Sequence, residues 1–222
     1  IMLIIDNSYF INEIYIPHAK PSITDSVTGV GTEIVSFIDE YERECLIKTL
    51  GYQLFKEFET KLDRNSINGL VNNADVKWDY LLNGREYTKS NGDLAHWQGL
   101  RYKTNQAYNK SLLAQYVYFF YEKSDDDSRV GVGNVKEKAA NADTVSKTPK
   151  VIAAWRKFCK SVQGSCSKPA VYIKHNGVGV DWYDSSGESS MYEFIAESNL
   201  VDETTYPNWK PTYFENANQF GI

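Results

Sequence analysis

The chain has 222 residues, of which 42% are hydrophobic and 14% aromatic, and its formal net charge is -5. This length and composition can supply one generous core, so we expect a single domain. Phosphate contacts rely on lysine and arginine, so the acidic balance argues against a protein that wraps nucleic acid with its whole surface. The cysteines are odd in number and lack a paired spacing, which predicts thiols rather than disulfides: Cys45, Cys159 and Cys166.

Residues 1–32 are predicted to form an N-terminal arm. The stretch from Leu3 to Ile16 is rich in isoleucine, tyrosine and phenylalanine, and Pro17 stops any regular element, which favours a strand or an extended arm. Its apolar start is too short to span a bilayer, so we expect a cytoplasmic protein with no membrane partner. Thr32 is placed to cap the helix that follows.

Residues 33–123 are predicted to form a helical core. Gly51 ends or kinks the first helix, and Asp75 and Gly84 are placed to cap the two ends of a short helix. The pair Asn91-Gly92 predicts a tight β-hairpin, because both residues tolerate positive φ. The last helix of this region is apolar around most of its circumference, so we expect it at the centre: Leu112, Leu113, Tyr116, Val117, Phe119 and Phe120.

Residues 124–148 are predicted to form an extended arm. They begin with acidic residues and lack an apolar stripe, so the arm should become ordered only against a neighbouring protein. An amphipathic helix returns at residues 149–162, with Trp155 expected in a core with Leu113, Val117 and Phe120. The arm residues expected at the interface are Arg129, Val130, Gly131, Val132, Gly133, Val135 and Lys136.

Residues 163–184 are predicted to contain a second hairpin, around His175-Asn176-Gly177. Residues 185–222 then form a short helix and an aromatic tail in which Pro207 and Pro211 exclude helix. We expect a docking tail whose removal leaves the helical fold largely intact. Its docking residues would be Trp209, Tyr213, Phe214, Phe220 and Ile222. The whole pattern predicts a mainly α fold, a helical bundle with extended arms and one or two small β-hairpins.

No motif indicates catalysis or a cofactor. Gly-Val-Gly tripeptides begin at Gly29, Gly131 and Gly177, but they lack the context of a phosphate-binding loop and are better explained as hinges. The run Asp125–Asp127 is out of register with a calcium-binding loop and is typical of a solvated segment. The three histidines are scattered, whereas a zinc site needs converging ligands. We therefore expect no enzyme, no cofactor and no metal.

One basic and aromatic stretch has the composition of a single-stranded nucleic-acid site: Trp97, Arg101, Tyr102, Lys103, Tyr108 and Lys110. Tyrosine and tryptophan at helical offsets are more often core or interface anchors. Two alternatives to the function considered below therefore stay open. One is a nucleic-acid-binding accessory protein that uses residues 97–110, and the other is a protein-interaction module that forms no ring.

A series of short motifs runs through the chain: Glu40-Tyr41-Glu42-Arg43-Glu44, Leu50-Gly51-Tyr52-Gln53-Leu54-Phe55, Trp78-Asp79-Tyr80-Leu81-Leu82-Asn83-Gly84, Trp97-Gln98-Gly99-Leu100-Arg101, Gly131-Val132-Gly133-Asn134-Val135-Lys136, Asn141-Ala142, Val145-Ser146, Ala154-Trp155 and Asn218-Gln219-Phe220-Gly221-Ile222. In this order they resemble the head-tail connector proteins of tailed phages, particularly phages of Bacteroides-like hosts. The resemblance covers about residues 33–158 and the last thirty residues, while residues 163–183 depart from it.

This resemblance implies a structural virion protein, made in the host cytoplasm and located in the neck. It implies a helical adaptor that forms a homo-oligomeric, dodecameric ring between the portal protein and the tail or further neck proteins. DNA would pass through the ring with only transient, non-specific contact, which the net charge of -5 suits. A ring needs each subunit to present two different surfaces, and long arms that lie over the neighbouring subunit would supply them.

Overall fold

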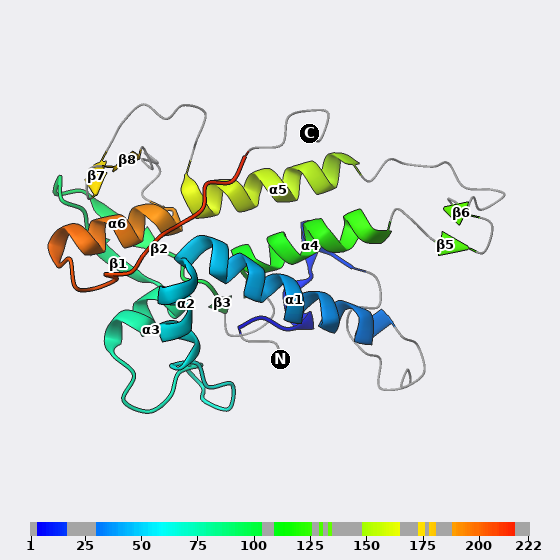
Figure 1. The fold of residues 1–222 in the computed structure, drawn as a ribbon, viewed down its shortest axis with the longest axis horizontal. Helices are drawn as coiled ribbons and strands as arrows, with labels where there is room; N and C mark the ends of the chain where they lie inside the picture. The colour runs from blue at the N-terminus through cyan, green and yellow to red at the C-terminus, as the bar shows by residue number, and fades with distance from the viewer. Residues whose placement is uncertain are drawn as a thin grey trace.

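The computed structural model describes residues 4–16, 30–103, 109–125, 129–130, 133–134, 148–164, 173–175, 178–180 and 188–215. The described chain is mainly helical, with small two-stranded antiparallel sheets, which confirms the predicted fold class (Figure 1). Its α-helices are α1 (Val30–Leu50), α2 (Tyr52–Glu59), α3 (Val76–Asn83), α4 (Leu112–Asp125), α5 (Thr148–Gln163) and α6 (Met191–Val201).

Helix α4 lies between α1 and α5 and is the centre of the core, as its sequence predicts (Figure 1). Every residue from Ser111 to Tyr118 is buried, so side chains on all sides of its first two turns are enclosed. Aromatic rings join the three helices. Tyr41 of α1 stacks on Phe120 with ring centroids 4.4 Å apart, and Tyr116 lies 4.9 Å from Phe158 of α5.

The helix ends follow the local signals in most places. Asp75 caps α3 by accepting a hydrogen bond from Lys77 N, and α1 and α3 are followed by glycines with positive φ, 81° at Gly51 and 84° at Gly84. These three predictions are confirmed. The predicted cap at Thr32 is wrong, because α1 already begins at Val30 and Thr32 therefore lies inside the helix.

Both predicted hairpins are present. Strands β1 (Arg85–Thr88) and β2 (Leu94–Trp97) pair around Asn91-Gly92, where Gly92 has a φ of 92°. Strands β7 (Ile173–His175) and β8 (Val178–Val180) pair on either side of Asn176-Gly177. Two shorter pairs were not predicted: β3 (Tyr102–Lys103) with β4 (Asn109–Lys110), and β5 (Arg129–Val130) with β6 (Gly133–Asn134).

The N-terminal segment, residues 4–16, differs from its prediction as a strand or extended arm. It forms two short 3-10 turns, Asn7–Tyr9 and Asn12–Ile14, and its large apolar side chains enter the core. The buried carboxylate of Glu42 on α1 accepts hydrogen bonds from Ile4 N at 2.9 Å and from Ile5 N at 2.8 Å. This contact satisfies two backbone donors that would otherwise be buried without a partner, so the segment is fastened to α1.

Candidate assembly surfaces

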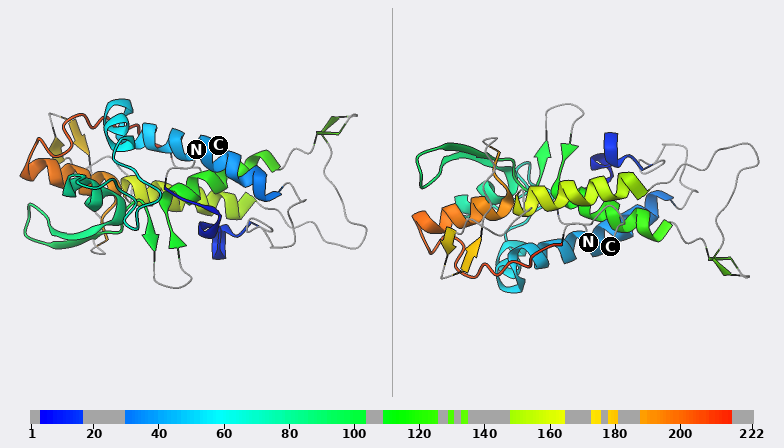
Figure 2. Two further views of the ribbon diagram at one scale, coloured as in Figure 1. Left: turned by 90° about the horizontal axis from the view of Figure 1, so that it is seen from below. Right: turned by 90° about the horizontal axis from the view of Figure 1, so that it is seen from above.

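The C-terminal strap, defined as residues 202–215, crosses the helical body from the end of α6 to α5 (Figures 1 and 2). Tyr206 is 1% exposed, and its ring lies edge-on to Trp78 of α3 and to Phe194 of α6. Its hydroxyl donates to Lys77 O at 2.7 Å. Burial raises the pKa of the Tyr206 hydroxyl well above its ordinary value. The start of the strap is thus enclosed by α3 and α6.

Two side-chain amides hold the strap by its backbone. Asn199 accepts from Tyr206 N at 2.8 Å and donates to Tyr206 O at 3.1 Å. Gln163 does the same at the other end, accepting from Phe214 N at 3.0 Å and donating to Phe214 O at 2.6 Å. Each side-chain amide bonds both the N–H and the C=O of one strap residue, as the backbone of a neighbouring β-strand would. Neither contact was predicted, although a glutamine that continues the apolar face of α5 was a usable signal.

The middle of the strap caps the C-terminus of α1. A helix leaves its last carbonyl groups without helical partners, and the break at Gly51 would expose them. Three of these carbonyls accept hydrogen bonds from the strap: Lys48 O from Thr212 N at 2.7 Å, Thr49 O from Trp209 Nε1 at 3.0 Å, and Leu50 O from Lys210 N at 3.2 Å. A Cβ at Gly51 would lie 2.9 Å from Lys210 O, so this approach also requires the glycine.

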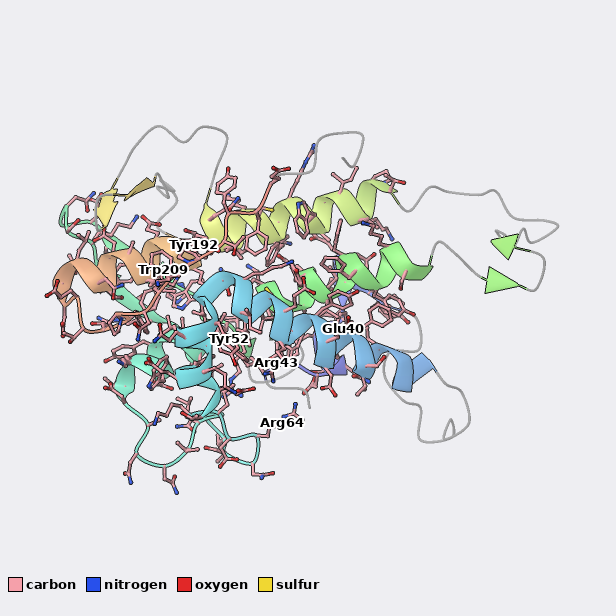
Figure 3. The ribbon with its side chains drawn as sticks, in the orientation of Figure 1. Glu40, Arg43, Tyr52, Arg64, Tyr192 and Trp209 are labelled. Atoms are coloured by element: carbon pink, nitrogen blue, oxygen red, sulfur yellow. The ribbon has the colours of Figure 1, made fainter. Side chains whose placement is uncertain are left out.

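This placement corrects the expectation of a docking tail for Trp209 and Phe214. Trp209 packs edge-on against Tyr192 of α6, with ring centroids 5.4 Å apart (Figure 3), and Phe214 is 5% exposed. Both therefore complete the core of their own chain. Tyr213 is 55% exposed and stays a candidate docking residue. Phe220 and Ile222, the last two predicted docking residues, lie outside the described residues.

The two ends of the predicted arm, residues 124–125 and 148, belong to α4 and α5, and between them only the β5–β6 hairpin is described. Strands β5 and β6 pair with Arg129 opposite Asn134 and Val130 opposite Gly133. All views place this hairpin beyond the neighbouring ends of α4 and α5 and away from the other helices (Figures 1 and 2). The other predicted interface residues of the arm lie outside the described residues: Gly131, Val132, Val135 and Lys136.

The basic and aromatic stretch does not form a stacking platform in the part that the structure describes. Trp97 is 2% exposed, stacks on Phe194 and donates from Nε1 to Leu81 O at 3.2 Å. Arg101 donates to Asn83 Oδ1 at 2.9 Å and, from Nη2, to Ile67 O at 3.3 Å, and burial lowers the pKa of its guanidinium. Bases cannot stack on a buried ring, so these two residues serve the fold. Tyr108 and the side chain of Lys103 are outside the described set.

The remaining pair of this stretch is accessible. Tyr102 is 37% exposed on β3, and Lys110 is half-buried opposite it on β4. One exposed aromatic beside one lysine is less than the row of stacking rings that single-stranded sites use. The described residues therefore supply little of the nucleic-acid site that the composition suggested.

The outer face of α1 and α2 is a further accessible surface (Figure 3). Glu40 and Arg43 are exposed on α1, and Tyr52 is 64% exposed at the start of α2. Arg43 lies over the ring of Phe55 and pairs with Glu59 at 2.9 Å, and the pKa of the Glu59 carboxyl is lowered by its hydrogen bonds and ion pairs, the one with Lys56 first. The face combines an exposed aromatic ring with both signs of charge, a mixture common at the rim of protein interfaces.

Metal sites and membrane-spanning helices were searched for in the part of the chain that the structure describes. Among the described residues, no group of three or more histidine, cysteine, aspartate or glutamate side chains converges on a possible metal position. None of the described helices is long and apolar enough to cross a membrane. Cys45 and Cys159 are buried thiols, and burial raises the pKa of Cys45, whereas Cys166 falls outside the described ranges.

Comparison with known proteins found no relative of this chain. No family model matches the chain, and no curated protein and no solved structure matches it either.

Proposed function

We propose that the protein is a structural virion protein, a head-to-tail connector that forms a ring between the portal and the tail of a phage. In this proposal DNA passes through the ring, and the portal protein and tail or neck proteins are its partners. The observation that carries it is the contrast between a closed body and the β5–β6 hairpin, which lies beyond the ends of α4 and α5. Residues 4–16 and the C-terminal strap pack onto the helices, whereas β5–β6 lies apart from them (Figures 1 and 2).

A body with a hairpin that extends beyond its helices suits a heterologous ring. In such a ring every subunit uses one surface to reach its neighbour and a different surface to receive the other neighbour. The β5–β6 hairpin would supply the reaching element, and an accessible face such as that of α1 and α2 would supply the receiving one. The glycines of Gly131-Val132-Gly133 let the hairpin approach a partner backbone closely.

The motif series and the net charge support the same proposal. Two residues of the motif Gly131-Val132-Gly133-Asn134-Val135-Lys136, which resembles head-tail connectors, are described, and these two, Gly133 and Asn134, form β6. A net charge of -5 disfavours adhesion of DNA to the lumen of a ring. The burial of Trp97 removes the main ring of the alternative nucleic-acid site.

The mass of the purified full-length chain tests the ring. We expect native mass spectrometry to show a closed oligomer, and replacement of residues 126–147 by a short glycine-serine linker to give a monomer. Far-ultraviolet circular dichroism should show that this variant keeps its helices, because the core residues that the structure describes all lie outside residues 126–147.

A matched control is Leu94→Ser, which removes an apolar side chain that is 68% exposed on β2, far from the arm. This variant should still form the ring. A wild-type chain that stays monomeric at every soluble concentration would contradict the ring. A chain absent from purified virions of the phage that encodes it would contradict the connector function itself.

A further inference from the structure

A cavity of about 180 Å³ lies where the start of α4, the last turns of α5 and residues 188–190 meet. Its polar lining includes Lys110, Gln115, Lys157, Lys160, Ser161 and Glu188. A second hollow, of about 290 Å³, opens towards the N-terminal segment and shares Lys110, Gln115 and Lys157 with the first. Gln115 therefore lines both hollows, together with Lys110 and Lys157.

Gln115 is the least satisfied polar group at this place. Its side chain is 4% exposed, and its Oε1 accepts no hydrogen bond from the described residues. Buried amide oxygens are nearly always paired, because water is lost on burial and must be replaced by another donor. An unpaired acceptor that borders a cavity indicates that a donor enters from outside the described chain.

The described lining of the cavity is rich in lysine. Lys110, Lys157 and Lys160 line it, with Glu188 also in the lining and Glu13 in the adjoining hollow. The N-terminus of α4, a helix of 14 residues, adds a partial positive charge beside Leu112. Ser111 already donates to Leu100 O and accepts from Leu113 N, so its hydroxyl is committed to the cap.

One lysine of the cavity already holds a carboxylate. Lys157 Nζ lies 2.6 Å from Glu13 Oε2, and this hydrogen bond lowers the pKa of the Glu13 carboxyl. The Glu13 side chain is 77% exposed, so an anion from solution can compete for the lysine. The described part of the lining contains no arginine, and lysines bind anions as point charges, which suits a tetrahedral oxyanion better than a planar carboxylate.

We propose that this cavity binds inorganic phosphate. Its oxygens would accept from the lysines and the first turn of α4, and its remaining proton would be donated to Gln115 Oε1. Inorganic phosphate keeps at least one proton at neutral pH, whereas sulfate and phosphodiesters carry none there. A phosphate monoester loses its last proton near pH 6, so it satisfies Gln115 only below that pH. The volume of about 180 Å³ also suits a small anion, since pockets for drug-sized ligands measure about 300 to 1,000 Å³.

Calorimetric titration of the full chain with inorganic phosphate, sulfate and methyl phosphate at pH 7.5 and low ionic strength tests this assignment. We expect one phosphate per chain. Sulfate and methyl phosphate should bind about tenfold more weakly or worse, because each lacks a hydrogen bond to Gln115. Methyl phosphate should recover affinity at pH 5.5, where it is protonated.

Variants distinguish phosphate binding in the cavity from non-specific binding by surface charge. Lys110→Gln should weaken phosphate binding about tenfold, and Gln115→Leu should weaken phosphate to the level of sulfate. The matched controls are Lys123→Gln at the far end of α4 and Lys150→Gln at the far end of α5, both exposed and both expected to bind phosphate normally.

Equal binding of sulfate and phosphate, or phosphate binding that Lys110→Gln leaves unchanged, would overturn the assignment. Absence of any phosphate heat would do so as well, provided that circular dichroism shows the chain to be folded. None of these outcomes bears on the connector proposal, because ring formation is measured by mass.

Discussion

Gln163 on α5 holds Phe214 of the C-terminal strap by both of its backbone polar groups, with Nε2 donating to Phe214 O at 2.6 Å and Oε1 accepting from Phe214 N at 3.0 Å. Gln163 is 0% exposed and Phe214 is 5% exposed, so no solvent replaces these bonds if the amide is lost. The strap is therefore part of the core, and its attachment can be tested by changing single residues.

Gln163→Leu should lower the free energy of unfolding by about 2 to 4 kcal/mol, because it leaves a buried donor and a buried acceptor unpaired. Urea denaturation followed by fluorescence measures the change. Lys150→Ala, an exposed change on the same helix, should stay within about 0.5 kcal/mol of wild type. Equal stability of the two variants would show that the amide clamp is not formed in solution.

Removal of the strap should unfold the chain or weaken it severely. A chain that ends at residue 205 loses two large buried aromatic side chains, Tyr206 and Phe214, and each such loss costs about 3 to 5 kcal/mol. A chain that ends at Glu215 keeps every strap contact described here and serves as the control. Melting temperatures compare the two. A stable, fully helical chain of 205 residues would restore the original expectation of a dispensable tail.

Lys89 and Glu193 form a buried ion pair, with Nζ and Oε1 2.6 Å apart and side chains that are 3% and 0% exposed. Lys89→Met should destabilise the fold by about 3 to 5 kcal/mol, because it leaves the Glu193 carboxylate buried without its cation. The double variant Lys89→Met with Glu193→Leu should recover much of this loss, since a well-packed apolar pair often replaces a buried ion pair at little cost. Denaturant titrations of the single and double variants measure both effects. No recovery in the double variant would show that the pair itself stabilises the fold.

The Glu193 carboxyl should also make the stability of the fold depend on pH. Burial raises the folded-state pKa of Glu193 above its ordinary value of 4.5, an effect that the nearby Glu197 increases and Lys89 opposes. The folded state therefore binds a proton more readily than the unfolded state. The stability contributed by the protonated Glu193 carboxyl is lost as the pH rises from about 4.5 through the raised pKa. Glu193→Gln should flatten this part of the stability profile, measured by denaturation at pH 4 to 8. An unchanged slope would contradict the assignment to Glu193.

Trp155 joins the core only in part. Its ring lies 4.5 Å from Phe119 and near Tyr116 and Phe158, and its Nε1 donates to Glu215 O at 2.8 Å. Trp155→Ala should therefore cost about 3 kcal/mol, the low end for a large aromatic residue. Trp155→Phe keeps most of the packing and loses the hydrogen bond, so it should cost about 1 kcal/mol. Thermal unfolding distinguishes the two. A loss of 5 kcal/mol or more in Trp155→Ala would mean that the residue is fully buried.

Local patterns predicted the features that depend on neighbouring residues. Asp75 caps α3 through a donor two residues away, and Asn91-Gly92 turns β1 into β2 because both residues accept the required backbone angles. The central position of α4 was also predictable, since a helix that is apolar on all sides must be enclosed. The placements of the N-terminal segment and the strap were not predictable in this way.

Residues within a few positions of one another account for the helices, the caps at Asp75 and Gly84, the two predicted hairpins and the mainly α class, so these features were predictable from the sequence. The inclusion of the two end segments in the core depends on contacts between residues far apart in the chain. Glu42 contacts Ile5, which is 37 residues away, and Gln163 contacts Phe214, which is 51 residues away. Such contacts satisfy backbone groups that carry no sequence signature, since every residue except proline has the same amide and carbonyl. Aromatic residues in a tail are therefore ambiguous until the fold shows whether the surface that covers them belongs to a partner or to the same chain.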